Sequence, residues 1–273
     1  MSLFDIYADY LDTLRIEKER DPKRLFVTDV GKCLRQVALR MVGAERKQPG
    51  PQDYMMWDLA EYIEETLMHA LDARGELIEY QAPLDIADRE NWGGRLDIVR
   101  VVDDHAQIVE VKTVRSNAFN FDDRPKQDHI YQTTIYDHYY DYVAVWTRHI
   151  DPVVWYADRG GSNPPEEYVI TPDFEPVGYL MDELEAVRRS LPALPDLLPK
   201  VLKLTNYKKV LKCVPDWRCS YCDYRDFSCH PDMGEEEWAT EKESWRPKAK
   251  ADLGKLYTWA EEQNHSGVLS VLL

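Results

Sequence analysis

Three charged residues in a pair of predicted strands, Asp97, Glu110 and Lys112, have types and spacing that suit metal-dependent chemistry. Glu110 and Lys112 are two residues apart, so a strand directs both side chains to one face of a sheet. Asp97 ends the run Gly-Gly-Arg-Leu-Asp in the preceding strand. Two carboxylates beside an ammonium group can hold a divalent cation and stabilise negative charge on a phosphate. On a solvated face, the same residues would form only weak surface pairs.

The turn between the two strands decides whether Asp97 joins the other two residues. If Asp103-Asp104 is a two-residue turn, Val102 pairs with His105. Asp97 then lies directly across from Glu110, with Cβ atoms roughly 4.5–5.5 Å apart. A turn of odd length without a bulge would instead place Asp97 on the opposite face of the sheet.

A divalent cation is the natural partner for this pair of carboxylates. Two carboxylates so close repel each other unless a cation lies between them, and Mg²⁺ or Mn²⁺ prefers such oxygen ligands. The cation would polarise a phosphoryl group and help to generate hydroxide from bound water. Lys112 can orient that water or stabilise the growing charge. Gly93 and Gly94 would let a substrate backbone approach closely, because they lack side chains. These residues therefore predict phosphodiester hydrolysis.

The cysteines form the second set of residues with clear chemistry. Cys33 lies near the start of the chain, whereas Cys219, Cys222 and Cys229 form the group C-x2-C-x6-C near its end. The count of five is odd, and clustered cysteines predict a metal or cluster site rather than disulfides. Zinc and an iron–sulfur cluster both remain open, because thiolates bind both. The candidates for the fourth ligand are Cys33, Cys213 and His230.

Helices and strands alternate along the chain in an order that predicts how these residues are positioned. Apolar residues recur at helical spacing in some segments and at a period of two in others. Cys33 falls inside one predicted helix. We expect an α/β fold with a mixed central sheet flanked by helices. The helices are expected at 1–20, 30–41, 53–73, 127–140, 174–191 and 249–262, and the strands at 76–86, 94–102, 106–114, 141–146, 153–156 and 167–171.

Composition limits the class of protein. The chain has 273 residues, of which 44% are hydrophobic and 31% charged, which suits one large domain or one domain with appendages. We find no apolar run long enough to span a bilayer and no secretory leader, so a cytoplasmic location is expected. The net charge of -16 argues against a protein that coats DNA, although a local basic groove remains compatible with it.

The motifs taken together resemble the PD-(D/E)xK nuclease superfamily, and within it the RecB-like exonucleases with an iron–sulfur cluster, which include the Cas-four-like group. The resemblance covers most of residues 25–230 and rests on G-G-R-L-D, E-V-K, H-I-Y-Q-T-T-I-Y and the early and late cysteines. It implies a restriction-endonuclease-like mixed central sheet flanked by helices, with a helical iron–sulfur-binding region. The x6 spacing and the additional Cys213 depart from the family's pattern, so they leave the fourth cluster ligand open.

The resemblance also implies a set of metal ligands. His69, on the helix before the strands, would bind Mg²⁺ or Mn²⁺ together with Asp97 and Glu110. The backbone carbonyl of Val111 would be a further ligand, and Lys112 would be the catalytic helper. Without the resemblance, the residue types alone would make His69 an exposed helical histidine.

Two further sets of residues acquire roles from the resemblance. Gln132 and Tyr136 match its Q-x3-Y motif and lie on one helix face, where Gln132 would hold the lysine or the DNA backbone and Tyr136 would contact DNA. Without the resemblance, this pair would be a half-buried helix face. The ligands of a structural [4Fe–4S] cluster would be Cys33, Cys219, Cys222 and Cys229.

The function implied is a Mg²⁺- or Mn²⁺-dependent deoxyribonuclease, an exonuclease acting on single-stranded DNA ends with 5′-to-3′ polarity. Recombination or CRISPR-adaptation proteins would be its partners, and no membrane is involved. The alternatives are a non-catalytic DNA-binding or assembly subunit and a zinc-binding interaction protein. The expected regions are an N-terminal helical region at 1–52 with the first cysteine, a nuclease core at 53–200, a cysteine region at 201–235 and a helical tail at 236–273.

Overall fold

The computed structural model describes residues 6, 10, 24–44, 46–84, 86, 88–116, 119, 124–142, 148–190 and 222–224. The chain divides into two compact units, the first formed by residues 1–20, 24–31 and 49–178 and the second by residues 21–23, 32–48 and 179–273. Several sequence predictions lie outside the described residues. These are the helix at 249–262, nearly all of the helix at 1–20, most of the strand at 141–146, and Cys213, Cys219 and Cys229.

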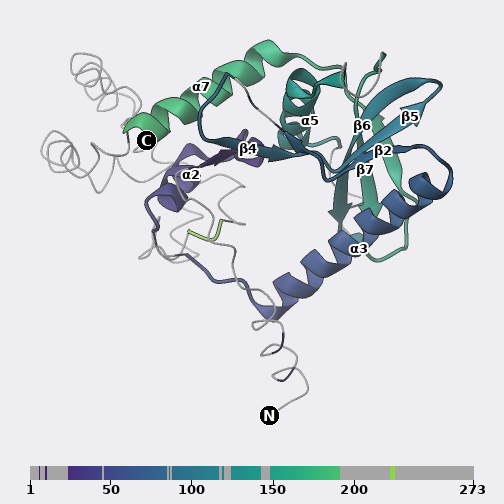
Figure 1. The fold of residues 1–273 in the computed structure, drawn as a ribbon. Helices are drawn as coiled ribbons and strands as arrows, with labels where there is room; N and C mark the ends of the chain where they lie inside the picture. Colours follow the sequence, from purple (N-terminus) through teal and green to yellow (C-terminus); the bar gives the residue numbers. More distant parts are fainter. Residues whose placement is uncertain are drawn as a thin grey trace, which may run out of the picture. The chain divides into compact units, whose positions relative to one another are not determined.

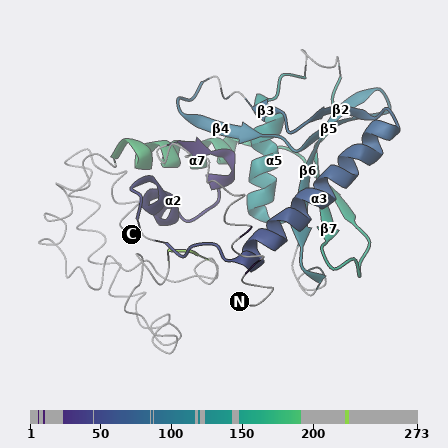
Figure 2. The ribbon, with the colours of Figure 1, turned by 60° about the horizontal axis from the view of Figure 1, so that its bottom comes forward.

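A five-stranded mixed sheet forms the centre of the first unit (Figures 1 and 2). Its strand order is β2-β5-β6-β7-β8. β6 and β7 run parallel, whereas the other neighbouring pairs are antiparallel. The predicted mixed sheet is therefore confirmed. The strands are β2 (Leu77–Tyr80), β5 (Ile98–Val102), β6 (His105–Val114), β7 (Val153–Asp158) and β8 (Glu166–Val169).

The hairpin of β5 and β6 has the register predicted from the sequence. Val102 pairs with His105, and the ladder continues to Ile98 opposite Val109. Asp103 and Asp104 form the two-residue turn, with φ angles of 48° and 61°. Two successive left-handed residues match the right-handed twist of a hairpin, and aspartate tolerates this conformation better than most side chains do. The predicted pairing of the two strands is therefore confirmed.

Two predicted strands are wrong in extent, because the chain bends and moves from one sheet to another. The strand expected at 94–102 is divided into β4 (Trp92–Arg95) and β5, with the bend at Leu96 and Asp97. The strand expected at 76–86 is divided into β2 and β3 (Pro83–Leu84). β4 pairs with β3 and with β1 (Leu25–Phe26) in a separate three-stranded sheet.

The glycines of β4 are in contact with the protein's own side chains. A Cβ atom on Gly93 would lie 2.6 Å from Arg24 Nε, and one on Gly94 would lie 2.9 Å from Val27 Cγ2. A side chain at Gly94 would clash with Val27, and one at Gly93 would require the Arg24 side chain to move. The expectation that these glycines make room for a substrate backbone is therefore wrong, since Arg24 and Val27 occupy that space.

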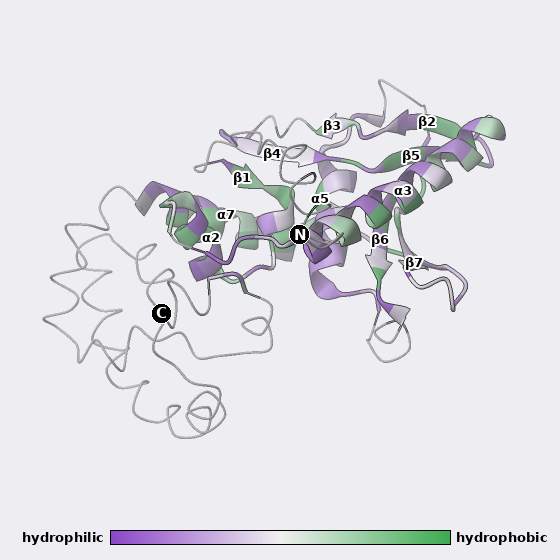
Figure 3. Ribbon diagram, turned by 90° about the horizontal axis from the view of Figure 1, so that it is seen from below, coloured by the Kyte–Doolittle hydropathy of each residue, from purple (hydrophilic) through white to green (hydrophobic). Residues whose placement is uncertain are grey.

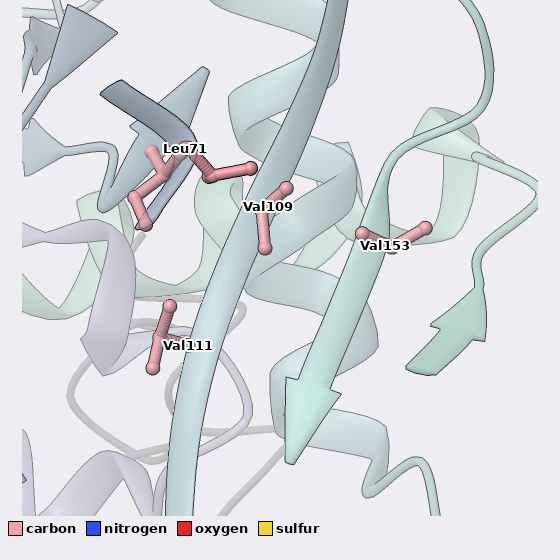
Figure 4. Close-up of a cluster of buried hydrophobic side chains, with 5 residues drawn as sticks. Leu71, Val109, Val111 and Val153 are labelled. Atoms are coloured by element: carbon pink, nitrogen blue, oxygen red, sulfur yellow. The ribbon is translucent and has the colours of Figure 1, made fainter. Parts of the chain in front are cut away.

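Two helices of the first unit, α3 (Pro51–Ala73) and α5 (Gln127–Tyr139), cover opposite faces of the five-stranded sheet. Leu71 of α3 packs on Val109, Val111 and Val153, which share one face because side chains alternate along a strand (Figure 4). Ile130 of α5 packs against the cluster on the other face that contains Val114, Val154 and Tyr156.

The long helix α3 is only lightly buried. Pro51 occupies its first turn, where a missing N–H has no cost, and Asp53 accepts a hydrogen bond of 2.8 Å from the Gly50 N–H. Leu71 is its one buried residue, and hydrophilic and hydrophobic residues alternate along its length (Figure 3). Among the described helices, none is both long enough and apolar enough to cross a membrane.

The second unit contains α2 (Leu34–Met41) and the greater part of α7 (Phe174–Ser190). Ala38 of α2 packs against Val187 of α7. Cys33 is the N-cap of α2 with extended backbone angles, so the prediction that it lies inside the helix is wrong by one residue at the helix boundary. The N–H of Lys47 donates a hydrogen bond of 2.8 Å to the carbonyl of Asp223 within the same unit.

Candidate active site

The bend between β4 and β5 brings Asp97 to the middle of β6. Asp97 Oδ2 accepts a hydrogen bond of 2.8 Å from the N–H of Val111. Glu110 is the preceding residue of β6, and its side chain is 1% exposed. The negative charge of Glu110 raises the pKa of Asp97, so the two carboxylates lie close enough to interact. The two carboxylates predicted from the sequence to face each other are therefore brought together.

Lys112 pairs with Glu110 on the same face of β6. Its ammonium group donates a hydrogen bond to Glu110 Oε1 and forms an ion pair with it. Burial acts to lower the pKa of Lys112, but the negative charges of Glu110 and Asp97 outweigh this effect and raise the pKa above its ordinary value. Lys112 is therefore a cation near pH 7, and its side chain retains 22% exposure to solvent.

Asp97 and Glu110 lie in surroundings that disfavour the ionised form of their carboxyl groups. Burial and the charge of Glu110 raise the pKa of Asp97 to about 8. Burial also raises the pKa of Glu110, although Lys112 counteracts it. Glu110 Oε2 is buried and has no hydrogen-bond partner among the described residues. A buried oxygen of this kind is costly unless it is paired.

These residues fit a divalent cation in their chemistry. Asp97 and Glu110 offer oxygen atoms, which Mg²⁺ and Mn²⁺ prefer, and a cation would compensate both the unpartnered Glu110 Oε2 and the repulsion between the carboxylates. Within the described ranges, no three His, Cys, Asp or Glu side chains are grouped closely enough to hold a metal ion by themselves. Water and backbone oxygens commonly complete such a shell.

Helix α3 presents a glutamate that sequence reasoning missed. Glu64 is half-buried, and its carboxylate accepts a hydrogen bond of 3.2 Å from Gln81 Nε2. Burial and the charge of Asp97 raise the pKa of Glu64, and Glu64 in turn raises the pKa of Glu110. His69 is exposed on the same helix. The spacing in the sequence could have indicated Glu64. It lies seven residues, or about two helical turns, before Leu71, so both residues share the helix face that contacts the sheet.

Helix α5 places Gln132 and Tyr136 against the other side of the carboxylates. Gln132 Nε2 donates a hydrogen bond of 2.7 Å to the Tyr136 hydroxyl, and both side chains are buried. Burial and the charges of Glu110 and Asp97 raise the pKa of Tyr136. Gln132 is therefore bonded to Tyr136 rather than to Lys112, and Tyr136 is 2% exposed.

His129 is a second residue that sequence reasoning missed. It lies three residues before Gln132, so both are on the same face of α5. Its Nδ1 is 2.6 Å from the Tyr156 hydroxyl, which also accepts the Lys126 N–H at 3.0 Å. Burial and the positive charge of Lys112 lower the pKa of His129 to about 4. His129 is therefore neutral near pH 7.

Two of the predicted cluster cysteines are described, and both belong to the second unit. Cys33 and Cys222 are each partly buried. Tyr224, close to Cys222 in the chain, is 4% exposed, and burial raises its pKa although Arg46 and Arg40 counteract this. The predicted iron–sulfur site also needs Cys219 and Cys229, which lie outside the described residues, so it stays a prediction.

Comparison with known proteins gives a family match and a likeness in fold. Residues 12–230 match the family described as the PD-(D/E)XK nuclease superfamily. A solved protein named SSO0001 is similar in fold, with a TM-score of 0.51 and 15% sequence identity over 86% of this chain and 98% of that chain. An alkaline exonuclease from Laribacter hongkongensis, LHK-Exo, has a TM-score of 0.41 and 14% identity over 68% of this chain and 96% of that chain. No curated protein is significantly similar in sequence. The likeness to SSO0001 shows the fold alone.

The raised pKa of Asp97 predicts how the stability of the metal-free protein depends on pH. The unfolded carboxyl ionises near its ordinary value of 3.8, whereas the folded one ionises at about 8. The contribution of the Asp97 carboxyl group to the free energy of unfolding is therefore fully present below pH 4 and is lost as the pH rises through about 8. Asp97→Asn removes the ionisation and keeps an acceptor for the Val111 N–H. In EDTA at pH 9, we expect this variant to exceed the parent in free energy of unfolding by on the order of 2 kcal/mol, measured by urea denaturation.

The matched control is Asp103→Asn, which removes an exposed carboxylate from the turn of the same hairpin. It should leave the difference between pH 5 and pH 9 unchanged. If parent and Asp97→Asn lose stability equally over this range, the raised pKa of Asp97 is wrong.

Proposed function

The chain belongs to the PD-(D/E)XK nuclease superfamily, and we propose that it hydrolyses phosphodiester bonds of DNA at the bend that holds Asp97. The observation that carries the proposal is the buried pair of carboxylates beside Lys112. Burial raises the pKa of both carboxyl groups, the charge of Glu110 raises the pKa of Asp97 further, and Glu110 Oε2 is buried without a hydrogen-bond partner among the described residues. This arrangement lowers the stability of the folded chain when no cation is bound, and a bound cation would offset that loss.

The proposed roles combine the geometry of the carboxylates with the roles that the resemblance implies. Asp97 and Glu110 would hold Mg²⁺ or Mn²⁺, with the carbonyl of Val111 as a further ligand. When bound, the ion would polarise the phosphoryl group and lower the pKa of a water molecule. Hydrolysis forms a bond between the water oxygen and phosphorus and breaks one phosphorus–oxygen ester bond. One product keeps the phosphate, and the other gains a hydroxyl.

The remaining residues would orient reactants and shape the site. Lys112, now paired with Glu110, would donate a hydrogen bond to the attacking water or to a phosphate oxygen. The hydrogen-bonded pair Gln132 and Tyr136 would close the site on the side of α5. Because Tyr136 is 2% exposed, its contribution is support of the carboxylates rather than broad contact with DNA.

The preferred substrate and polarity are taken from the resemblance to RecB-like exonucleases. We infer that the enzyme is an exonuclease acting on single-stranded DNA ends in the 5′-to-3′ direction. Recombination or CRISPR-adaptation proteins would be its partners. The acidic net charge of -16 makes non-specific coating of DNA unfavourable, which is consistent with a substrate held at a defined site.

Replacing Glu110 tests the enzymatic proposal. Glu110→Gln keeps the shape of the side chain but removes its charge, so kcat on single-stranded DNA with Mn²⁺ should fall by roughly 100-fold to 1,000-fold. The assay uses oligonucleotides labelled at the 5′ or the 3′ end, in single- and double-stranded form, and so reports polarity and strand preference. The control is Glu167→Gln. Glu167 is an exposed residue of β8 that forms an ion pair with Arg100 of β5, and its replacement should leave the activity unchanged. Equal cutting by the parent and Glu110→Gln would show that Glu110 is not catalytic.

The helix ligand is tested by comparing two residues of α3. The resemblance assigns this role to His69, whereas the charge coupling to Asp97 favours Glu64. We expect Glu64→Gln to raise the Mn²⁺ concentration needed for half-maximal activity by about tenfold, because it removes one carboxylate near the cation. His69→Asn should change it by less than about twofold. The opposite result would assign the role to His69, as the resemblance implies.

We also propose a structural [4Fe–4S] cluster held by Cys33, Cys219, Cys222 and Cys229. The support is the resemblance, together with the presence of Cys33 and Cys222 in one compact unit. Protein purified without oxygen should contain iron and acid-labile sulfide in equal amounts, and Cys222→Ala should lose both. Cys213→Ala should retain them. A colourless protein that contains zinc would contradict the cluster and favour a zinc site that includes Cys213.

A further inference from the structure

Two arginines lie side by side where the parallel strands β6 and β7 end. The last paired residues are Val114 and Asp158. The ladder continues one step further, since the N–H of Arg159 donates a hydrogen bond of 2.9 Å to the carbonyl of Val114. Arg115 and Arg159 therefore occupy neighbouring register positions, which place their side chains on the same face of the sheet.

These two cations have no anionic partner in the part of the chain that the structure describes. Arg159 Nε is buried and lacks a hydrogen-bond acceptor. Burial and the positive charge of Arg115 both lower the pKa of Arg159. A partly buried guanidinium beside another cation is unfavourable unless an anion binds between them. Two adjacent arginines suit a phosphate group, whose oxygens accept several hydrogen bonds at once.

The backbone around the arginines is held firmly by its own hydrogen bonds. The carboxylate of Asp158 accepts hydrogen bonds from Ser116 Oγ at 2.6 Å, from the N–H of Gly160 at 2.8 Å and from Asn163 Nδ2 at 2.7 Å. The ends of β6 and β7 are thereby tied to each other. Asp158 contributes its charge to this turn rather than to an ion pair with either arginine. These hydrogen bonds fix the backbone that carries the two guanidinium groups, which favours binding of a rigid group such as phosphate.

The arginine pair lies close to the proposed site along the same strand. Arg115 follows Lys112 by three residues, which is about 10 Å along an extended strand. Because side chains alternate, Arg115 and Lys112 belong to opposite faces of the sheet. The pair is therefore displaced from the phosphate that would be cut, and it lies at the carboxyl ends of parallel strands, where ligands of α/β proteins commonly bind.

We propose that Arg115 and Arg159 bind a phosphate of the substrate strand at a distance from the one that is hydrolysed. This inference rests on the proposed function, because it takes DNA as the ligand. The phosphate is either the 5′-terminal one or an internal phosphodiester, and both present the same charged oxygens. The pair would position the strand so that the scissile phosphate meets Lys112 and the carboxylates.

The test measures binding and cleavage separately with full-length protein. Fluorescence anisotropy with labelled single-stranded oligonucleotides in Ca²⁺ gives the Kd, and cleavage in Mn²⁺ gives KM and kcat. Arg159→Gln and Arg115→Gln should each raise Kd and KM by about tenfold and change kcat by less than about threefold. The slope of log Kd against log salt should fall by about 0.7 for each phosphate that the variant no longer neutralises. Arg159→Lys should recover part of the affinity.

Arg148→Gln is the matched control, since Arg148 is an exposed arginine at the opposite end of β6, where its carbonyl accepts the Ala106 N–H. It should bind like the parent. Thermal unfolding of each variant confirms that the fold is retained. An effect limited to 5′-phosphorylated oligonucleotides identifies the terminal phosphate as the ligand, whereas an equal effect on 5′-hydroxyl oligonucleotides identifies an internal one.

The two proposals fail in different ways. If Arg159→Gln, Arg115→Gln and the parent have the same Kd and salt dependence, the arginine site is overturned whether or not the protein cuts DNA. Absence of DNA binding by the parent also overturns it. If binding depends on the arginines but no divalent cation supports cutting, the arginine site stands and the proposed nuclease activity fails.

Discussion

The hydrogen bond from the Val111 N–H to Asp97 Oδ2 joins the bend between two sheets to the central strand of the larger one. It forces two carboxylates together, because Glu110 precedes Val111 in β6. Their repulsion is balanced in part by Lys112, which pairs with Glu110 from the same face. Burial raises the pKa of both carboxyl groups, the charge of Glu110 raises that of Asp97 further, and Glu110 Oε2 has no hydrogen-bond partner among the described residues. The site is thus maintained against its own electrostatic cost, as expected of residues kept for chemistry.

The mixed sheet explains how groups from distant parts of the sequence meet. α3 and α5 pack on opposite faces, so Glu64 approaches the carboxylates from one side and Tyr136 from the other. The parallel pairing of β6 and β7 has a second consequence, since it brings Arg115 beside Arg159 where both strands end. In this way, a chain with an acidic net charge can present two arginines to the phosphates of a DNA strand.

Sequence reasoning succeeded where the determining interactions are local. The two-residue turn at Asp103 and Asp104 fixes the register of its own hairpin, and the observed pairing of Val102 with His105 is the predicted one. It was wrong about the strand expected at 94–102, because the break at Leu96 and Asp97 arises when β4 joins a second sheet with β1. It also misjudged Gly93 and Gly94, whose neighbours Arg24 and Val27 come from a remote segment. No local pattern contains these contacts.

By itself, the sequence determined the residue types and their spacing in β6, the face shared by Glu110 and Lys112, and the facing position of Asp97. These follow from the period of a strand and the geometry of a turn. Only the tertiary structure decided which residue of α3 approaches the carboxylates, because a lightly buried helix has no apolar stripe strong enough to define its orientation. Only the tertiary structure, likewise, placed Arg115 beside Arg159, since two strands separated by a long connection become neighbours through sheet pairing alone.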